Sequence, residues 1–187
     1  MIISIHQPNF MPWYPFFQKI DASDIFVVMC NCQYEKRNFQ NRFNLNDKWY
    51  TMSVNKGLCS QCPLELITNK RYLSPVKDWN DIKVNLKEYS SVLDQFDDCI
   101  SDSLVETNVC IIRKICSMLG IQTEIVLDYP TDLLRTERLG DICKHYGATT
   151  YLSGPSGKKY IDLNYFPSDI NITYQKQQIK VPILEKL

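Results

Sequence analysis

The sequence predicts an α/β fold with a mostly parallel central sheet and helices on both of its faces. Short apolar segments bounded by turn residues alternate along the chain with segments whose apolar residues recur at helical spacing. A chain of 187 residues with 44% hydrophobic side chains can enclose one substantial core but is short for two. We therefore expect residues 1–187 to form a single domain.

The first third of the chain predicts a strand, a helix and two further strands. Residues 1–5 are apolar and run into a polar turn, which is typical of a buried strand. Pro12 suits the first turn of a helix that extends to Ala22. Residues 24–29 are rich in apolar and β-branched side chains, and residues 48–54 alternate between two faces, so both predict strands.

The rest of the chain continues the alternation of helices and strands. Periodicity is weak over residues 56–98, except for a helical stripe from Trp79 to Tyr89. The firmest helix runs from about Ser103 to Leu119, where Gly120 can stop it. A second helix is predicted from Thr136 to Tyr146, and strands are predicted over residues 122–127, 149–152 and 171–175.

The charge balance argues against binding driven by the field of the whole protein. The 21 basic side chains equal the 21 acidic ones, so the net charge does not favour nucleic acid or an anionic membrane. No apolar stretch approaches the roughly 20 residues of a membrane-spanning helix. The first five residues also lack the pattern of an export signal, and we expect a cytoplasmic protein without membrane attachment.

The eight cysteines are expected to be reduced thiols, because the cytoplasm keeps thiols reduced. We therefore predict no structural disulfide. Cys59 and Cys62 form a CxxC pair that could supply half of a zinc site, but no second CxxC or paired histidines follow. We expect no bound metal.

The first segment with chemical potential is the turn that begins at His6. Gln7 and Asn9 add amides there, at the carboxyl end of a predicted strand, where ligands gather in open α/β sheets. We predict that His6 is the catalytic acid or base and that Gln7 and Asn9 bind substrate. The alternative is a histidine that only satisfies buried carbonyl groups.

The second segment spans residues 33–42 and combines cations, amides and aromatic rings. Arginines offer planar forks for phosphate or carboxylate, and an aromatic ring offers a face for a base or sugar. The alternatives are a solvated charged loop or a patch for nucleic acid. The predicted ligands of a small anion or nucleotide are Gln33, Glu35, Lys36, Arg37, Asn41 and Arg42.

The third segment, residues 153–160, resembles a phosphate-cradling loop in kind. Its glycines permit close backbone approach and a lysine stands nearby, but it is not the GxxxxGK[ST] pattern. The alternative is a tight structural turn. The predicted binding residues are Ser153, Gly154, Gly157, Lys158 and Tyr160.

Several of these motifs, in the same order, resemble the WbqC-like family. The resemblance covers nearly the whole chain and rests on residues 5–10, 12–13, 16–20, 33–37, 39–42, 135–139 and 151–160 together with Asn108. It implies a role in O-antigen and capsule synthesis, and some relatives are labelled glycine transferases. The implied reaction transfers a glycyl or related acyl group to a nucleotide-linked amino sugar. The resemblance leaves the acyl donor open between glycine with ATP as cofactor and a charged transfer RNA.

Two departures from the family pattern bear on this expectation. Relatives often have Asp-x-Val-Gln where this chain has Cys30-Asn31-Cys32-Gln33, so an acidic role cannot be carried over to Cys30. Relatives usually continue past the last strand with a further segment, so we expect this form to bind ligand less well if that segment closes the site. The oligomeric state is not indicated by the sequence.

Two other classes of function remain open at this point. A non-catalytic module could bind nucleotide sugars, or an assembly partner of the same pathway, with the same residues. A nucleic-acid-binding protein would use Lys36, Arg37 and Arg42, and its affinity would fall steeply with salt. Beyond a charged transfer RNA as acyl donor, we expect no nucleic-acid partner.

Overall fold

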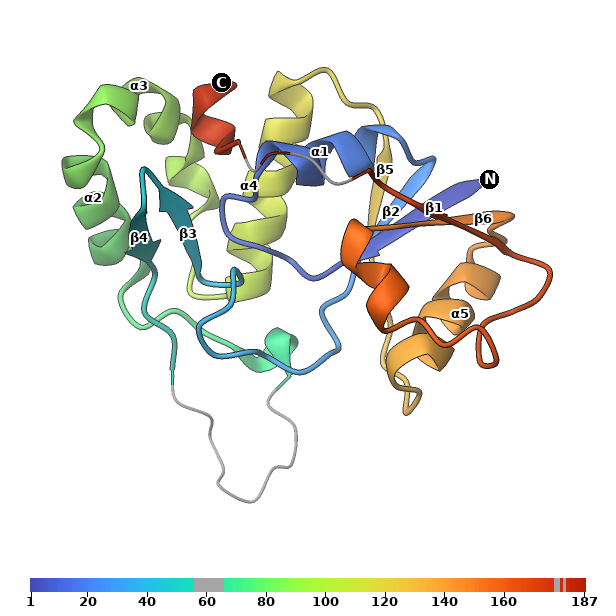
Figure 1. The fold of residues 1–187 in the computed structure, drawn as a ribbon. Coiled ribbons are helices and arrows are strands. Elements are labelled where there is room, and N and C mark those ends of the chain that lie inside the picture. Colours follow the sequence, from blue (N-terminus) through green and yellow to red (C-terminus); the bar gives the residue numbers. More distant parts are fainter. Residues whose placement is uncertain (56–65, 177–178, 180) are drawn as a thin grey trace.

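The chain folds around a five-stranded sheet in which neighbouring strands run parallel (Figure 1). The computed structural model describes residues 1–55, 66–176, 179 and 181–187. The strand order is β5-β2-β1-β6-β7, so β1 lies at the centre. The bounds are β1 Ile2–His6, β2 Ile25–Val28, β5 Glu124–Leu127, β6 Thr150–Ser153 and β7 Asn171–Tyr174.

Helices cover both faces of this sheet, as the sequence predicts. Phe26 and Val28 of β2 pack into a core with α1 (Tyr14–Asp21) and α4 (Leu104–Met118). The intervening residue Val27 points to the other face, where it packs with α5 (Arg135–His145). Alternate side chains of a strand point to opposite faces, so two separate cores form. The predicted α/β architecture is confirmed.

An antiparallel hairpin and a group of helices lie on the far side of α4 from the sheet (Figure 1). The hairpin joins β3 (Arg42–Leu45) to β4 (Lys48–Thr51), and the helices are α2 (Pro75–Asn85) and α3 (Ser90–Leu93). Asn46 and Asp47 have positive φ, as a two-residue hairpin turn requires. The strand predicted over residues 48–54 therefore exists, but it pairs with β3 outside the main sheet.

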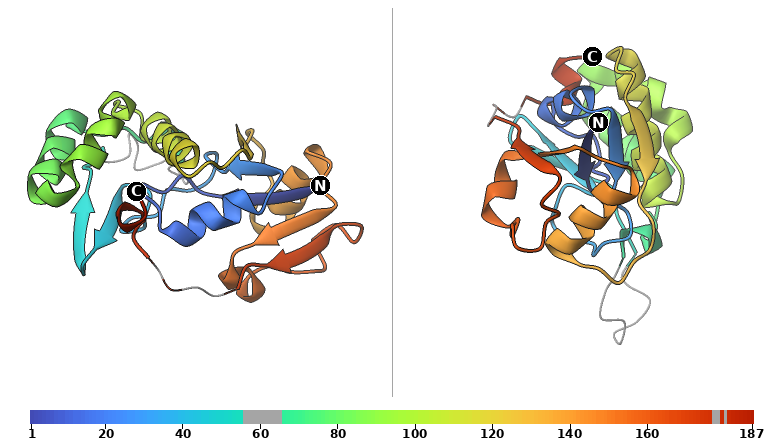
Figure 2. Two further views of the ribbon diagram at one scale, coloured as in Figure 1. Left: turned by 90° about the horizontal axis from the view of Figure 1, so that it is seen from above. Right: turned by 90° about the vertical axis from the view of Figure 1, so that its right-hand side faces the viewer.

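The end of the chain returns across the start of α1 (Figure 2). The side-chain amide of Gln175, just after β7, donates a hydrogen bond to Pro15 O at 2.8 Å. Tyr14 N donates to Val181 O at 2.9 Å, and Ile183 and Leu184 are buried in the core that contains α1. These contacts fix the beginning of α1 beside the carboxyl end of β7.

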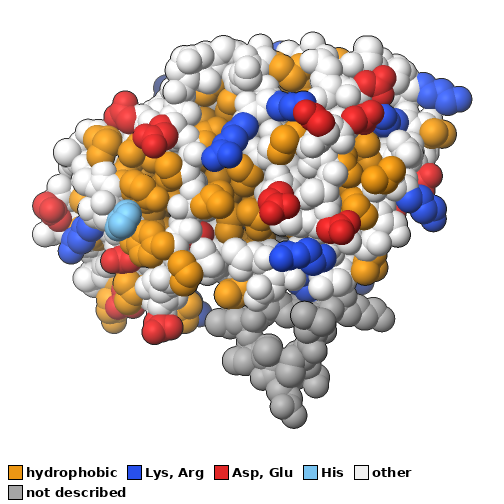
Figure 3. Space-filling model, turned by 180° about the vertical axis from the view of Figure 1, so that it is seen from behind, with side chains coloured by type: hydrophobic (Ala, Val, Ile, Leu, Met, Phe, Trp, Pro, Cys, Tyr) orange, Lys and Arg blue, Asp and Glu red, His pale blue; other side chains and the backbone are white. Residues whose placement is uncertain are grey.

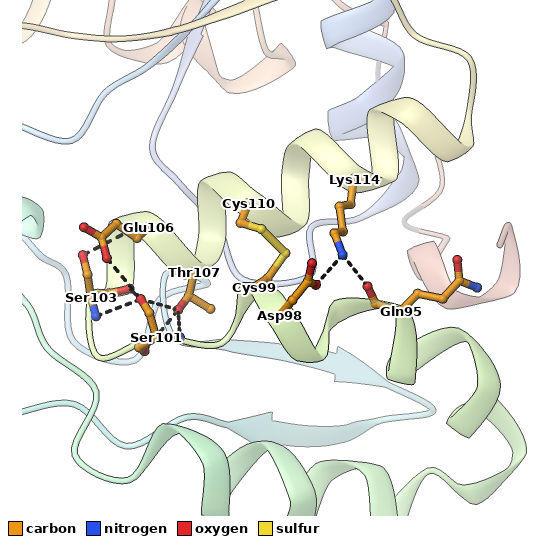
Figure 4. The surroundings of a disulfide bond; sticks show 9 residues. All are labelled: Gln95, Asp98, Cys99, Ser101, Ser103, Glu106, Thr107, Cys110 and Lys114. Atoms are coloured by element: carbon orange, nitrogen blue, oxygen red, sulfur yellow. Dashed lines mark hydrogen bonds and ion pairs between the residues drawn. A yellow bond between two sulfur atoms is a disulfide. The ribbon is translucent and has the colours of Figure 1, made fainter.

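The prediction that no structural disulfide forms is wrong. A disulfide joins Cys99, at the end of the 3-10 helix Asp94–Cys99, to Cys110 in α4 (Figure 4). The two Cα atoms are 5.3 Å apart, which suits a disulfide. The prediction relied on the expected compartment of the protein and not on the positions of the thiols. The Cys59–Cys62 pair lies outside the described residues.

Within residues 1–55, 66–176, 179 and 181–187, none of the helices combines the length and the apolar character that crossing a membrane requires. Within the same residues, no group of three or more His, Cys, Asp or Glu side chains is arranged to hold a metal ion.

Candidate functional site at the carboxyl ends of the strands

The order in which the chain adds strands to the parallel sheet reverses between β1 and β6. The chain leaves β1 toward α1 and continues to β2 on one side, whereas β6 leads to β7 on the other side. The β6–β7 connection contributes Phe166 and Ile170 to the core on the α5 face, opposite α1. Open α/β sheets bind ligands at such a reversal, outside the carboxyl ends of the strands. We call this place the switch point.

His6 ends β1 at the switch point. Its Nδ1 lies 3.0 Å from Gln7 O, and because a carbonyl oxygen can only accept, Nδ1 must carry the proton in this contact. The lone pair is then on Nε2, for which no hydrogen bond exists within the described residues. The ring is half-buried and packs edge-on against Phe16, with centroids 4.9 Å apart. Nδ1 of His6 is thus engaged by the backbone, whereas Nε2 has no hydrogen-bond partner within the described residues.

A buried lysine lies close to His6. Lys19 is only 3% exposed, and its Nζ donates to Ile5 O at 3.1 Å. Burial lowers the pKa of Lys19 to about 7. Burial, with a smaller contribution from the charge of Lys19, lowers the pKa of His6 to about 3, although the bond to Gln7 O opposes this. His6 is therefore a neutral imidazole at neutral pH.

Hydrogen bonds between amides join the first and second segments. Gln40 Nε2 donates to Gln7 Oε1 at 2.6 Å, and Gln7 Nε2 contacts the sulfur of Cys32 at 3.5 Å. Asn108, fully buried in α4, donates to both Pro8 O and Gln40 O, at 2.8 and 2.7 Å. These bonds bring the two segments together, and Gln7 is oriented by protein groups. The side chain of Asn9, which is 9% exposed, has no hydrogen bond among the residues described.

Within the second segment, Asn41 and Arg42 are engaged by the protein itself. Asn41 accepts from Tyr34 Oη at 2.9 Å and donates to Met52 O at 2.7 Å. The guanidinium of Arg42 lies 4.0 Å from the centre of the Trp49 ring and donates to Arg37 O. These two side chains support the loop, and Arg42 does not offer a free fork to an anion.

The other predicted residues of the second segment lie on the surface. Glu35 Oε2 accepts from Asn38 at 2.6 Å, and Gln33 forms an isolated β-bridge with Leu66. Lys36 and Arg37 are exposed, and Arg37 has a φ of 64° because the loop turns sharply there. The two exposed cations are the residues of this segment that remain suited to an anionic ligand.

The third segment begins beside β1, because β6 pairs with β1 in the sheet. Ser153 is fully buried, and a Cβ on Gly157 would collide with Ser153 Oγ, so only glycine fits at residue 157. A Cβ on Gly154, in contrast, would meet nothing within 4 Å. Gly157 therefore has a packing role, and Gly154 borders open space at the switch point.

The lysine and tyrosine of the third segment are exposed. Lys158 belongs to the 3-10 helix Pro155–Lys159, and its Nζ lies 5.2 Å from the centre of the Tyr174 ring. Tyr160 follows directly and is 58% exposed. The third segment therefore presents a cation at the carboxyl end of β7, on the same edge of the sheet as His6.

A buried ion pair supports the loop after β2. Asp128 accepts from Cys30 N at 2.8 Å and from Asn31 N at 3.1 Å, and it forms an ion pair with Arg138 of α5. Burial is the main cause that raises the pKa of the Cys32 thiol to about 11, and it raises that of Cys30 as well. Both cysteines are therefore protonated at neutral pH, which argues against a thiolate nucleophile here.

Several of these supporting residues stand in the motifs that resemble the family, but the sequence alone indicates no role for them. Gln40, Asn108 and Arg138 are in that group, and their polarity gives no sign of which carbonyl or carboxylate they meet. Lys19 did carry a signal, because a lysine between Phe16 and Ile20 falls on the apolar side of a predicted helix. That position indicates burial.

A polar surface pocket lies away from the switch point. It is found between β4 and α2, has a volume of about 190 Å³, and is lined in part by Trp49, Thr51, Asp78 and Asp81. None of the predicted catalytic or binding residues lines it.

Comparison with known proteins identifies the family. The model of the WbqC-like protein family matches residues 7–182. The chain is also 29% identical over 187 residues to a Mycobacterium tuberculosis protein named "Uncharacterized protein Rv1507c", covering 92% of this chain and 80% of that protein. No solved structure matches the chain. Because the family model spans almost the whole chain, including the turn after His6 and residues 153–160, the protein belongs to the WbqC-like family.

Proposed function

We propose that the switch point binds a nucleotide-linked amino sugar and that the protein transfers a glycyl or related acyl group to the amine of that sugar. The pathway would be the synthesis of bacterial cell-surface polysaccharide. The single observation that carries the proposal is that β1 and β6 are neighbours in the sheet, so the turns that follow them lie side by side at the switch point. Such a place suits a nucleotide ligand in open α/β sheets.

The residues around the switch point have the properties that this ligand needs. Gly154 borders open space, so backbone and ligand can approach closely. Lys158 stands on one side of β1, and Lys36 and Arg37 follow β2 on the other. These exposed cations suit phosphate groups. Asn9 has an amide without a hydrogen bond in the described chain and could contact the sugar.

The proposed step forms a bond between the sugar nitrogen and the acyl carbonyl carbon. The bond from that carbon to its leaving group breaks, and the leaving group departs with the electron pair. The attacking amine must also lose a proton, and we assign the role of base to Nε2 of His6, because Nδ1 is engaged with Gln7 O. ATP with glycine, or a charged transfer RNA, would supply the activated acyl group.

The low pKa of His6 places a condition on this role. A histidine with a pKa of about 3 is a weak base in the ligand-free protein. A phosphate bound nearby favours the protonated imidazole and raises its pKa. The proposal therefore requires that the anionic ligand itself strengthens His6 as a base.

The test is a product assay with a matched histidine control. Purified protein is incubated with UDP- or dTDP-linked amino sugars, glycine and ATP, or with glycyl transfer RNA, and the mass of the glycyl adduct is sought. We expect an adduct with wild type and with His145→Ala, but none with His6→Ala, which should still bind the nucleotide sugar. Equal turnover by His6→Ala would remove His6 from the mechanism, and binding without any adduct would reject the transfer.

The second candidate function is a binding module that does no chemistry. The low pKa of His6 favours it, because a neutral imidazole is a good hydrogen-bond partner without being a good base. Isothermal titration calorimetry with the same nucleotide sugars separates the two. Binding that depends on Gly154 and Asn9, with no product from any donor, would support the module.

A further inference from the structure

An apolar groove lies on the back of the molecule, between α4 and the end of β5 (Figure 3). It has a volume of about 360 Å³ and is lined mainly by Val105, Glu106, Val109, Cys110, Arg113 and Leu127. Leu127 is 46% exposed, although it belongs to a strand of the sheet. Figure 3 shows hydrophobic side chains gathered on this face among separate acidic and basic ones.

The charges along the groove have a regular arrangement. Glu106 and Arg113 are both exposed and lie seven residues apart, so they share one face of α4 and are two turns apart. Val109 and Cys110 lie midway between them on the same face. One end of the groove is therefore acidic, the other is basic, and the middle is apolar.

Both charged groups keep the capacity to bind an additional partner. Arg113 uses Nη2 to donate to Ile125 O at 3.1 Å, and a guanidinium has further donors. Within the described residues, the carboxylate of Glu106 accepts one hydrogen bond, a long one of 3.3 Å from the Ser101 hydroxyl. Lys114, which also borders the groove, is paired with Asp98 and so does not compete for Glu106.

We propose that this groove is a two-fold symmetric interface between two copies of the chain, formed by α4 helices that pack antiparallel. A two-fold axis near Val109 and Cys110 places Glu106 opposite Arg113 of the second copy, and Arg113 opposite Glu106. Both ion pairs form at once, as a two-fold interface requires. A patch whose opposite charges lie at equal distances from its apolar centre is complementary to itself, and this favours a second copy over an unrelated partner.

Charge reversal tests the pairing. We expect the wild type to show a mass near twice 21.9 kDa in sedimentation equilibrium. Glu106→Arg or Arg113→Glu alone should weaken dimerisation at least about tenfold, because each change places two pairs of like charge in contact. The double variant Glu106→Arg/Arg113→Glu restores both pairs and should dimerise again. Asp169→Arg, a reversal on an exposed loop, is the control and should behave as wild type.

A second readout does not depend on ion pairs. In Cys99→Ser the thiol of Cys110 is released near the proposed axis, and copper phenanthroline should oxidise it. The two Cys110 thiols would lose two protons, pass one electron to each of two Cu(II) ions, and form a disulfide that joins two copies. Cys99→Ser/Cys110→Ser should give no such product on a non-reducing gel. The proposal is overturned if the wild type is monomeric at every concentration, if single reversals leave the dimer intact, or if Cys99→Ser cross-links no better than the double variant.

Discussion

Gln40 donates its side-chain amide to Gln7 Oε1 across 2.6 Å and so joins the turns that follow β1 and β2. Gln40 is held in turn by two donors: its Oε1 accepts from Glu35 N at 3.1 Å, and its carbonyl oxygen accepts from Asn108 at 2.7 Å. The orientation of Gln7 beside His6 therefore depends on residues far apart in the sequence. Substitutions of the residues that hold Gln7 should therefore change the site by moving Gln7, and not by removing a group that contacts ligand.

Asn108→Ala should strongly destabilise the fold. The change leaves Pro8 O and Gln40 O without their donor and removes the acceptor of the Tyr72 hydroxyl, which lies 3.0 Å away. Each unsatisfied buried group costs about 1–3 kcal/mol, so we expect a loss of roughly 3 kcal/mol or more in the free energy of unfolding. Urea denaturation measures it. The exposed Asn85→Ala should stay within about 0.5 kcal/mol of wild type, and an equal effect of the two would refute the buried network.

Substitution by alanine should affect stability at one glycine of the third segment and ligand binding at the other. Gly157→Ala forces a methyl group into Ser153 and should lower the free energy of unfolding by about 1–3 kcal/mol. Gly154→Ala has room and should change stability by less than about 1 kcal/mol. It should nevertheless weaken nucleotide-sugar binding in calorimetry, because the methyl group occupies the space proposed for ligand. Undiminished binding by a folded Gly154→Ala would place the ligand elsewhere.

Stability should rise with pH above neutrality through Lys19. The folded pKa of about 7 lies below the usual 10.5, so between these values the unfolded chain binds more protons than the folded one. The free energy of unfolding gains up to about 1.4 kcal/mol for each pH unit in this range. Lys19→Met should remove this slope. Denaturation curves from about pH 7 to pH 8.5, before most thiols titrate, make the comparison. Parallel pH profiles of the two proteins would contradict a lowered pKa.

His6 should also make the free energy of unfolding increase with pH, but over a lower pH range. Its folded pKa of about 3 lies below the usual 6.5, so its contribution is present above about pH 6.5 and is lost as the pH falls toward 3. Nuclear magnetic resonance of the imidazole should show a neutral ring at pH 5. Lys19→Met should raise the pKa of His6, since the charge of Lys19 is one of the causes that lower it. A His6 ring that titrates near 6.5 in wild type would disprove the burial argument.

Loss of the disulfide should lower stability only under oxidising conditions. The bond closes a loop across a sequence separation of 11 residues, for which chain entropy gives about 3 kcal/mol. Cys99→Ser/Cys110→Ser should therefore unfold at lower urea than oxidised wild type and match wild type treated with reductant. A variant with unchanged stability in both conditions would show that the bond does not form.

The sequence predicted the main sheet well because its signals are local. The apolar runs at β1 and β2 and the helical stripe of α4 identify their elements without knowledge of contacts. The hairpin was half missed, since β3 (Arg42–Leu45) begins at the last residue of the predicted ligand segment 33–42, and no strand was predicted over residues 43–45. The alternation of Phe43 and Leu45 before Asn46-Asp47 was a usable hairpin signal.

The candidate site was harder to predict because side-chain partners are not local. Arg42 looks like a free cation in sequence, but Trp49 and Arg37 O occupy it. His6 looks like a base with an ordinary pKa, but burial and Lys19 lower that pKa. The disulfide forms because the 3-10 helix Asp94–Cys99 packs against α4. The spacing of the cysteines in the sequence does not reveal this contact.

A crystal structure of the protein with a UDP-linked amino sugar tests the central claim most directly. We predict electron density for the pyrophosphate at the switch point, between the turns that follow His6 and Ser153, with the sugar amine within reach of His6 Nε2. Ligand density in the polar pocket between β4 and α2, with the switch point unchanged, would contradict the account.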